Sequence, residues 1–400
     1  MKIAQINAVY GYGSTGVIVE DIEKTIKADG SKPYIVYRST NKDAKNGYKV
    51  GNRFDWAFHA AYTRLFGKQG YASKRATKKL LKWFDSVSPD VIHLHNLHSN
   101  YINLPLLLKY CAEKNIKTVL TLHDCWFFTG KCFHFIESNC EKWKVGCDKC
   151  PRNKSDVKSL FFDRTKKVFN DKKRLFKNIK DLTVVGCSDW ISELAKESAV
   201  FAEKKVLTIR NGIDLSVFKP IDCAFRNEHG LNGKFVILGM ANKWLDKRNE
   251  ETVGALIKNL PDDCAIVLVG CNDEQKGRAL SDKVIKLGFV RDKGELAKIY
   301  SSADVFVNLT LADNLPTVNM ESIACGTPVI TYNVGGSPEL VSEKKTGYIV
   351  EKFDVKALTD CINKIKSGVI SQAACRKYAE ENFDKDKNYN RYLDIYKGLI

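Results

Sequence analysis

The chain has 400 residues, of which 44% are hydrophobic and 28% charged, and its 64 basic and 47 acidic side chains give a net charge of +17. This size predicts two domains rather than one hydrophobic core, and the composition excludes a disordered or repetitive protein. The absence of any run of about 18 uninterrupted apolar residues excludes a membrane-spanning helix, and the start, MKIAQINAVYGYG, fits a buried strand better than a secretion signal. We therefore expect a cytoplasmic protein whose charge favours anionic partners: phosphorylated small molecules, anionic lipid or nucleic acid.

Short β-rich segments alternate with helical patterns along the first half, which predicts βαβ units around a parallel sheet. The segments are KIAQINAVY, PYIVYRS, PDVIHLH, KTVLTLHD and LTVVGCS, with a helix over 15–29 after the first. After RNGIDLSVFKP the pattern restarts with KFVILGMAN, CAIVLVG, KVIKLGFV, ADVFVNLT and TPVITYN. We predict an α/β protein with two Rossmann-like domains, 1–215 and 216–384, facing across a cleft. A C-terminal helix over 385–400 could pack back on the first domain, and ligands are expected at the carboxyl ends of the strands.

The segment GYGSTG at 11–16 follows the first strand and opens the first helix. Glycines here allow a phosphate to approach the free N–H groups of a helix N-terminus. The same spacing occurs in dinucleotide-binding proteins, but the second strand ends without the acidic residue that would hold an NAD ribose. Arg38 could accept the 2′-phosphate of NADP instead, which keeps an NADP-dependent oxidoreductase as an alternative. A glycine turn that only packs a strand against a helix is the structural alternative.

Two histidine-containing segments lie at predicted strands. DVIHLHNLH contains His93, His95 and His98, and LTLHD contains His123. His93 and His95 share one face of a strand, whereas His123 is at a carboxyl end, where sites of such sheets are built. We therefore favour His123 as a site residue over a histidine that is merely buried.

Four of the thirteen cysteines lie within nineteen residues, in an insertion over 125–151 that follows His123. Their spacing is Cys-x7-Cys-x6-Cys-x2-Cys. In a reducing compartment this pattern predicts a structural zinc site, with the ligands Cys132, Cys140, Cys147 and Cys150. Unligated thiols in an ordinary loop are the alternative, and the other nine cysteines are expected in the core.

The next segment, 151–180, holds eleven basic and three acidic side chains, a net charge of +8. Its aliphatic and aromatic residues interleave with the charges, which is typical of a basic amphipathic helix at an anionic membrane surface. A solvated helix with an apolar stripe facing the core explains the pattern equally well.

The second half offers two groups of charged residues after predicted strands. GMANKWLDKR contains Lys243, Lys247 and Arg248, which could bind a diphosphate. DNLPTVNMESIACGTP places Asp313 in a loop and Glu321 inside a helix that begins near Pro316 and ends before Gly326. Their placement fits two carboxylates that accept hydrogen bonds from the hydroxyls of two sugars better than a general acid–base pair. A capping Asp and a buried Glu are the alternative.

Together these motifs resemble the retaining nucleotide-sugar glycosyltransferases of the GT-B fold, specifically the bacterial glycosyltransferase family 4 type used in polysaccharide assembly. The resemblance covers nearly the whole chain. It depends on GSTG at 13–16, HLHNLH at 93–98, LTLHD, RNGID at 210–214, the Asp-x7-Glu pair, NVGGSPEL at 333–340 and TGYIV at 346–350. The family's usual pair is Glu-x7-Glu, so Asp313 is a departure with a shorter side chain.

The resemblance implies a role for each matching residue. Glu321 would bind the donor's ribose hydroxyls and Asp313 the transferred sugar, while His123 would line the pocket near the reacting centre. Arg248, in the place of the family's lysine, and Lys243 would bind the leaving diphosphate. The catalytic candidates are thus His123, Asp313 and Arg248, and the other donor-binding residues are Gly13, Gly16, Asn314, Leu315, Pro316 and Thr317. No catalytic metal is expected, because an oxocarbenium-like transition state depends chiefly on a stabilised leaving group.

The resulting prediction is a cytoplasmic enzyme, peripheral to the inner face of the cell membrane. It would transfer a sugar from a UDP- or GDP-linked donor to a lipid-linked or polysaccharide acceptor in capsule or exopolysaccharide biosynthesis. An NADP-dependent oxidoreductase gives no reason for RNGID or for the Asp-x7-Glu pair. A basic nucleic-acid-binding module is a third alternative, but the chain has no nucleic-acid-binding motif, so we expect no nucleic-acid partner.

Overall fold

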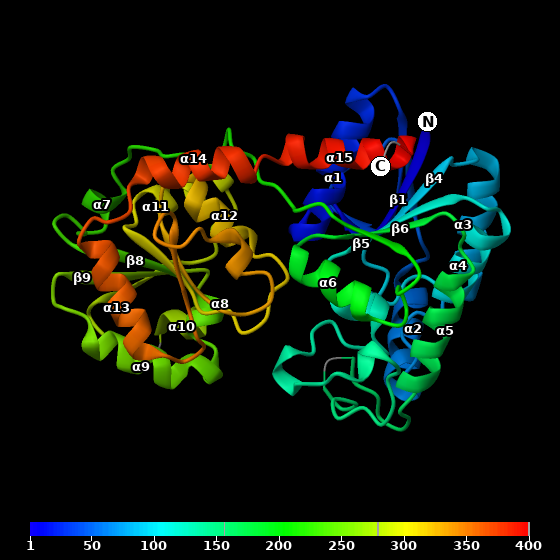
Figure 1. The fold of residues 1–400 in the computed structure, drawn as a ribbon, viewed down its shortest axis with the longest axis horizontal. Coiled ribbons are helices and arrows are strands. Elements are labelled where there is room, and N and C mark those ends of the chain that lie inside the picture. Colours follow the sequence, from blue (N-terminus) through cyan, green and yellow to red (C-terminus); the bar gives the residue numbers. More distant parts are fainter. Residues whose placement is uncertain (156, 278–279, 399–400) are drawn as a thin grey trace. The chain divides into compact units, whose positions relative to one another are not determined.

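The computed structural model describes residues 1–155, 157–277 and 280–398 (Figure 1). They form two compact units, one of residues 1–210 with most of the C-terminal helix and one of residues 211–385. The sequence-based boundary at 215/216 falls five residues after this division.

The first unit is built on a seven-stranded parallel sheet with the strand order β3-β2-β1-β4-β5-β6-β7. Its strands are β1 Lys2–Tyr10, β2 Lys32–Thr40, β3 Gly47–Lys49, β4 Val91–Leu94, β5 Lys117–Leu122, β6 Leu182–Gly186 and β7 Lys205–Thr208. Its helices are α1 Gly13–Ala28, α2 Arg53–Phe66, α3 Lys74–Val87, α4 Leu104–Glu113, α5 Thr165–Lys177 and α6 Asp189–Glu197. The first helix therefore begins two residues earlier than the pattern predicted.

The second unit repeats this architecture with six parallel strands in the order β10-β9-β8-β11-β12-β13. The strands are β8 Phe235–Met240, β9 Cys264–Val269, β10 Val284–Lys286, β11 Val305–Asn308, β12 Val329–Tyr332 and β13 Gly347–Val350. The helices are α7 Phe225–Glu228, α8 Ala241–Trp244, α9 Glu250–Asn259, α10 Asp273–Gly277, α11 Lys293–Ser301, α12 Thr317–Ala324, α13 Val355–Lys366 and α14 Gln372–Asn382. The predicted α/β class with two parallel sheets is confirmed.

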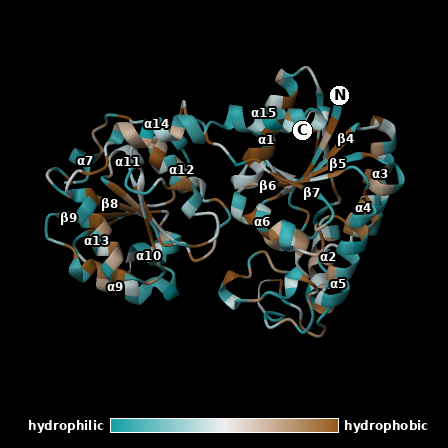
Figure 2. Ribbon diagram, viewed as in Figure 1, coloured by the Kyte–Doolittle hydropathy of each residue, from teal (hydrophilic) through white to brown (hydrophobic). Residues whose placement is uncertain are grey.

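Apolar residues, coloured brown in Figure 2, dominate the central strands of both sheets. All six residues of β9, CAIVLV, are buried, as are six of the first seven of β1. Parallel strands covered by helices on both faces have this composition, because neither face meets water. The same hydrophobic pattern therefore specifies both the strands and the helical layers that cover them.

Each sheet has a topological switch point, and the motifs predicted to bind ligands lie there. β4 pairs with β1 in the first sheet, and β11 pairs with β8 in the second, so consecutive crossovers diverge at these two places. Ligands of open parallel sheets bind just beyond the carboxyl ends of such strands. GYGSTG and the loop with Asp313 follow β1 and β11, while HLHNLH and GMANKW begin in the last two residues of β4 and β8.

The C-terminal helix α15, Lys385–Lys397, packs on the first sheet. Tyr389, Tyr392 and Tyr396 join one apolar cluster with Ile3 and Ile22. Hydrogen bonds also join the two: the Tyr396 hydroxyl lies 2.7 Å from His93 Nδ1, and the Tyr392 hydroxyl 2.9 Å from Thr121 Oγ1. The last residues of the predicted helix, 399–400, lie outside the described residues. Among the helices that the structure describes, none is long and apolar enough to span a bilayer.

Candidate active site

The turn between β1 and α1 contains the GYGSTG segment. Gly13, the first residue of α1, has a φ of +65°, and a Cβ atom there would meet nothing within 4 Å. Gly16 differs, because its Cβ would lie 3.1 Å from the Val9 side chain. The missing side chain of Gly16 therefore serves strand–helix packing, and only Gly13 has the open surroundings expected of a glycine that faces a ligand.

Asn7 connects this turn to the end of β4, a role that sequence reasoning missed. Its amide N–H donates to Val9 O at 2.8 Å and to Thr15 Oγ1 at 3.3 Å, and its Oδ1 accepts from Asn96 N at 3.1 Å. The side chain is fully buried. A buried amide must find hydrogen-bond partners, so an asparagine inside an apolar first strand is the signal that could have indicated this role.

His123 directly follows β5 and contacts His95. His95 Nδ1 and His123 Nε2 are 3.0 Å apart, and the two rings stack with 5.3 Å between their centroids. His93 shares a face with His95, as predicted, with 4.0 Å between the ring centroids. Burial lowers the pKa of His123 to about 4, although the charge of Asp124 opposes the shift. His123 is therefore a neutral imidazole at physiological pH, suited to hydrogen bonding rather than to carrying charge.

His98 takes a different role from the other histidines. Its Nε2 lies 2.8 Å from Asp124 Oδ2, and Asp124 Oδ1 accepts from Trp126 N at 2.8 Å. Burial alone would raise the pKa of Asp124, but His98 and the Trp126 N–H outweigh burial and lower it. The pair therefore anchors the 3-10 helix Cys125–Phe128 that opens the insertion.

Arg38, the residue on which the oxidoreductase alternative depended, lies against an aromatic ring. Its guanidinium carbon is 4.8 Å from the centroid of the Trp56 ring. A cation in this position is stabilised by the ring's negative face. This contact explains the presence of an arginine at position 38 without a bound 2′-phosphate.

The loop after β11 holds Asp313 by its backbone and its carboxylate. Asp313 Oδ1 accepts from Leu315 N at 3.2 Å, and its carbonyl oxygen accepts from Gly336 N at 3.2 Å. Gly335 has a φ of +56°, and a Cβ there would lie 1.9 Å from the same carbonyl oxygen. The NVGG segment therefore fixes the Asp313 backbone in a way that requires glycine. Among the neighbours expected to bind the donor, Asn314, Leu315 and Pro316 are buried, and Thr317 is the first residue of α12.

Glu321 lies in the second turn of α12 and is partly buried. The Tyr300 hydroxyl donates to Glu321 Oε2 at 3.1 Å. Burial raises the pKa of Glu321 to about 7, while the Tyr300 hydrogen bond and the Lys293 charge act in the opposite direction. A carboxylate in this state gains from additional hydroxyl donors, because they stabilise its charged form. The helix ends as predicted, with Gly326 at a φ of +86° just after the cap.

The cations after β8 are more constrained than the sequence suggested. Arg248 is paired within its own loop, because its Nε and Nη2 donate to Asp246 at 2.9 Å and 2.7 Å. This bidentate hydrogen bond is the main reason that the pKa of Asp246 is lowered to about 2. Asn249 donates to Lys243 O at 2.9 Å and to Leu309 O at 2.8 Å, which ties this loop to the end of β11. A diphosphate would have to compete with Asp246 for Arg248.

The candidate residues thus form two groups, one in each unit. In the first unit, Gly13 and His123 lie at the carboxyl edge of β1, β4 and β5, joined through Asn7, Asn96 and His95. In the second, Asp313, Glu321 and the loop with Arg248 lie at the carboxyl edge of β8 and β11. Sequence reasoning missed Asn7, Tyr300, Asp246 and Asn249, whose partners are remote in sequence or unmarked by a motif.

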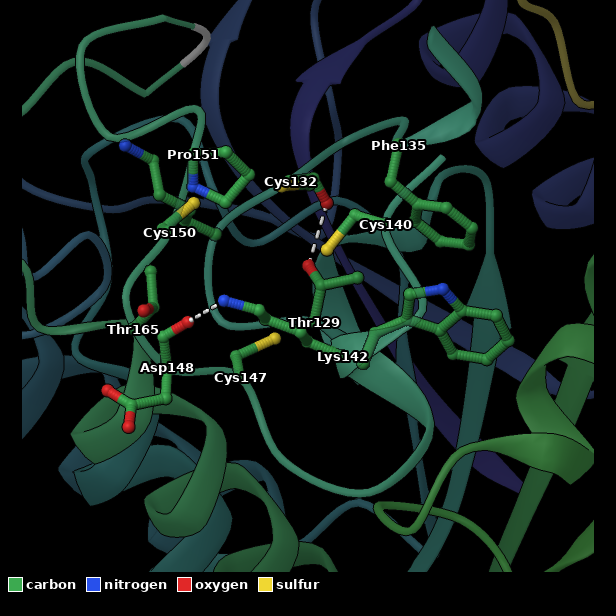
Figure 3. Close-up of a pocket in the computed structure, with 12 residues that line it drawn as sticks. Thr129, Cys132, Phe135, Cys140, Lys142, Cys147, Asp148, Cys150, Pro151 and Thr165 are labelled. Carbon is green, nitrogen blue, oxygen red and sulfur yellow. Dashed lines mark hydrogen bonds between the residues drawn. The ribbon is translucent and has the colours of Figure 1, made fainter. Parts of the chain in front are cut away.

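The four cysteines of the insertion line one pocket with Thr129, Lys142 and Asp148 (Figure 3). Gly130 N donates to Cys147 Sγ at 3.2 Å, and Lys142 Nζ donates to Asp148 O at 2.8 Å. All thirteen cysteines are free thiols. As the side chains lie, the described residues contain no group of three or more His, Cys, Asp or Glu that could hold a metal. A zinc site at Cys132, Cys140, Cys147 and Cys150 therefore stays a prediction.

Two known protein families together match most of the chain. Residues 15–217 match the family described as Glycosyltransferase Family 4, and residues 224–382 match the family described as Glycosyl transferases group 1. A protein named as a colanic acid biosynthesis glycosyl transferase, WcaC of Escherichia coli (strain K12), is 23% identical over the full length of both chains. The Escherichia coli protein named UDP-Gal:alpha-D-GlcNAc-diphosphoundecaprenol alpha-1,3-galactosyltransferase is 25% identical over 49% of this chain and 55% of its own.

Solved structures share the fold along the whole chain. Sucrose-phosphate synthase from Thermosynechococcus elongatus superposes with a TM-score of 0.70 at 18% identity, covering 100% of this chain and 98% of that one. Anabaena Alr3699/HepE in complex with UDP superposes with a TM-score of 0.66 at 15% identity, covering 100% of both. These likenesses establish the GT-B fold, and both matching families are glycosyltransferase families, which leaves the oxidoreductase alternative unsupported.

Proposed function

We propose that this chain, which belongs to glycosyltransferase family 4, transfers a sugar with retention from a nucleotide-diphosphate donor to a lipid-linked or polysaccharide acceptor in surface polysaccharide biosynthesis. The observation that carries the donor part is the placement of Glu321. Its carboxylate lies on α12 beside the switch point of the second sheet and receives a hydrogen bond from Tyr300. A carboxylate there can accept hydrogen bonds from both hydroxyls of a ribose, which a nucleotide donor would present.

The neighbouring residues would complete the donor site. Asp313, held by Gly335 and Gly336, would accept a hydrogen bond from a hydroxyl of the transferred sugar. Lys243 and Arg248 would neutralise the leaving diphosphate, and Arg248 would exchange its bidentate contact with Asp246 for one with a phosphate. His123, as a neutral imidazole, would offer a hydrogen bond near the reacting sugar and would not act as a charged acid.

Two relatives support the classes of donor and acceptor. A structural neighbour was solved in complex with UDP-glucose, and a relative that matches half of this chain is named for a UDP-galactose donor and a diphosphoundecaprenol acceptor. We therefore favour a UDP-linked sugar and a lipid-linked acceptor over a GDP-linked donor. The name of WcaC, a colanic acid biosynthesis glycosyl transferase, supports a role in polysaccharide synthesis.

A thermal-shift panel of UDP, GDP, ADP and NADP tests the donor class directly. A ligand that binds only the folded protein raises its melting temperature, so UDP should stabilise the protein and NADP should not. Glu321→Gln should lose most of this stabilisation, because an amide presents a donor to one of the two ribose hydroxyls. Glu343→Gln, at an exposed position of the same unit, is the matched control. Stabilisation by NADP alone, or an equal response of both variants to UDP, would overturn the proposal.

A further inference from the structure

The apolar residues of α5 do not form the membrane-facing surface that the basic segment 151–180 suggested. Val168, Phe169, Leu175 and Phe176 are all buried, so this helix is amphipathic toward the core of its own unit. Within the segment, the exposed apolar residues are those just before the helix: Leu160, Phe161 and Phe162, with 52%, 70% and 40% of their surface exposed. Asp156, one of the three acids of the segment, lies outside the described residues.

Helix α2 turns polar residues toward the core and large apolar residues toward solvent. Its buried residues are His59 and Thr63, whereas Phe54 and Phe58 are 79% and 66% exposed. With Tyr62, Leu65 and Phe66 they form a stripe at the i, i+4, i+8, i+11 and i+12 spacing of one helix face. Large apolar side chains along a surface helix normally face the core, so an exposed stripe of them indicates a partner.

Polar contacts fix this orientation of α2. The buried His59 lies 2.8 Å from Ser73 Oγ through Nδ1 and accepts a hydrogen bond from Gly70 N at 3.1 Å through Nε2. Thr63 Oγ1 donates to Asn100 Oδ1 at 2.9 Å. Rotating the helix to bury its phenylalanines would leave these polar groups unsatisfied, which is costly. The apolar face is therefore held toward solvent by the fold itself.

The α2 face and residues 160–162 are one continuous surface. The rings of Phe66 and Phe162 lie 6.2 Å apart and nearly parallel, and Leu160 N donates to Arg64 O at 2.8 Å. Both elements lie in the first unit (Figure 1). We call the surface formed by Phe54, Phe58, Leu65, Phe66, Leu160, Phe161 and Phe162 the aromatic face.

Cations surround the aromatic face. Arg53, Arg64, Lys158 and Arg164 are exposed beside its members, and the Arg164 guanidinium lies 4.8 Å from the Phe162 ring centroid. In the part of the chain that the structure describes, no ion pair joins these four to a carboxylate. The nearby acids are engaged: both Asp55 and Asp163 accept backbone hydrogen bonds, at 3.0 Å and 2.6 Å. The surface is therefore both apolar and positively charged.

We propose that the aromatic face docks this protein on an anionic lipid bilayer, with the phenylalanine side chains in the interfacial region and the surrounding cations among the lipid phosphates. Exposed aromatic rings with a ring of Lys and Arg are the composition of peripheral membrane surfaces. A second copy of the chain is a poorer occupant, because two such faces would bring their cations together. The inference rests on the proposed function only in that a lipid-linked acceptor would be presented at a bilayer.

Sedimentation of the full chain with vesicles tests the docking surface without nucleotide or acceptor. The protein should pellet with phosphatidylcholine–phosphatidylglycerol vesicles and remain largely in solution with phosphatidylcholine alone. The variant Phe54→Ser/Phe58→Ser/Phe161→Ser should lower the partition coefficient at least about tenfold, because each ring contributes apolar area. Phe289→Ser, which changes a phenylalanine that is 78% exposed in the other unit, should leave it unchanged.

Additional measurements separate the docking from folding, from self-association and from the proposed activity. Arg53→Gln/Arg64→Gln/Arg164→Gln should weaken binding and flatten its dependence on salt, and the UDP-induced melting shift should persist in all these variants. Equal partition of the wild type and the triple serine variant, or equal partition onto neutral and anionic vesicles, would overturn the proposal. So would a dimer in solution that the serine substitutions dissociate. Loss of the UDP response with docking intact would count against the proposed function alone.

Discussion

Gly335→Ala is expected to damage transfer through a backbone atom of Asp313. An alanine Cβ would lie 1.9 Å from Asp313 O, whereas carbon–oxygen contacts in proteins begin at about 3.3 Å. One of the two segments must therefore move by about 1.4 Å. The left-handed backbone at this position adds about 1–2 kcal/mol for a residue with a side chain, and the overpacked contact adds about 1–3 kcal/mol.

The displacement affects Asp313, which we propose contacts the transferred sugar, and not Glu321, which we propose binds the ribose. Asp313 would shift by about an ångström, a misplacement that can reduce turnover by about 10²-fold, while Glu321 is held separately on α12 by Tyr300. We therefore expect turnover of a UDP-sugar to fall about a hundredfold, with the melting shift induced by UDP largely retained. Radiolabelled sugar transfer and thermal shift measure the two effects separately.

A matched glycine distinguishes the steric clash from the cost of the backbone conformation. Gly233 has a φ of +72° in the same unit, but a Cβ there would meet nothing within 4 Å. Gly233→Ala should lower the free energy of unfolding by about the amount that the left-handed backbone costs at Gly335. It should leave turnover near the wild-type value. If Gly335→Ala and Gly233→Ala turn over at similar rates, the NVGG segment does not position Asp313 and the reasoning fails.

Two further predictions follow from the titration of Glu321 and from the cysteine pocket. Burial raises the pKa of Glu321 to about 7 from an ordinary 4.5, and only the carboxylate accepts two hydroxyl hydrogen bonds, so UDP affinity should fall as the pH drops below about 7. Calorimetry of the wild type against Glu321→Gln checks this, and parallel pH profiles would contradict it. For the insertion, elemental analysis of protein purified without chelator should find one zinc per chain, lost in Cys147→Ser/Cys150→Ser and kept in Cys223→Ser. No metal in the wild type, with four titrating thiols at the pocket, would leave the insertion an unligated loop.

Much of the architecture was predictable because its signals are local. The alternation of apolar runs with helical patterns specifies parallel strands and covering helices from short-range periodicity alone. The end of α12 was also predictable, since Gly326 follows the helix where the sequence pattern placed it. The carboxyl ends of the strands, and hence the neighbourhood of His123, Asp313 and Glu321, followed from strand order rules.

Side-chain partners depended on the tertiary structure. Arg248 was expected to face a ligand, but its pairing with Asp246 arises from a 3-10 turn that the spacing did not reveal. The raised pKa of Glu321 depends on burial among residues remote in sequence, and its partner Tyr300 lies on another helix. Such effects depend on which distant segments pack together, and a pattern with a period of two or four residues carries no information on that.

The aromatic face shows the same division. Sequence alone determined that the first unit is strongly basic around 151–180 and that aromatic residues accompany the charge. Only the tertiary structure decided that the aromatics of α5 turn inward and that α2 turns its phenylalanines outward. The physical reason is that an amphipathic pattern predicts an apolar face toward the core, and buried hydrogen bonds to remote residues can impose the opposite orientation. For α2 that choice was made by the buried hydrogen bonds of His59 and Thr63, whose partners lie up to 37 residues away in the chain.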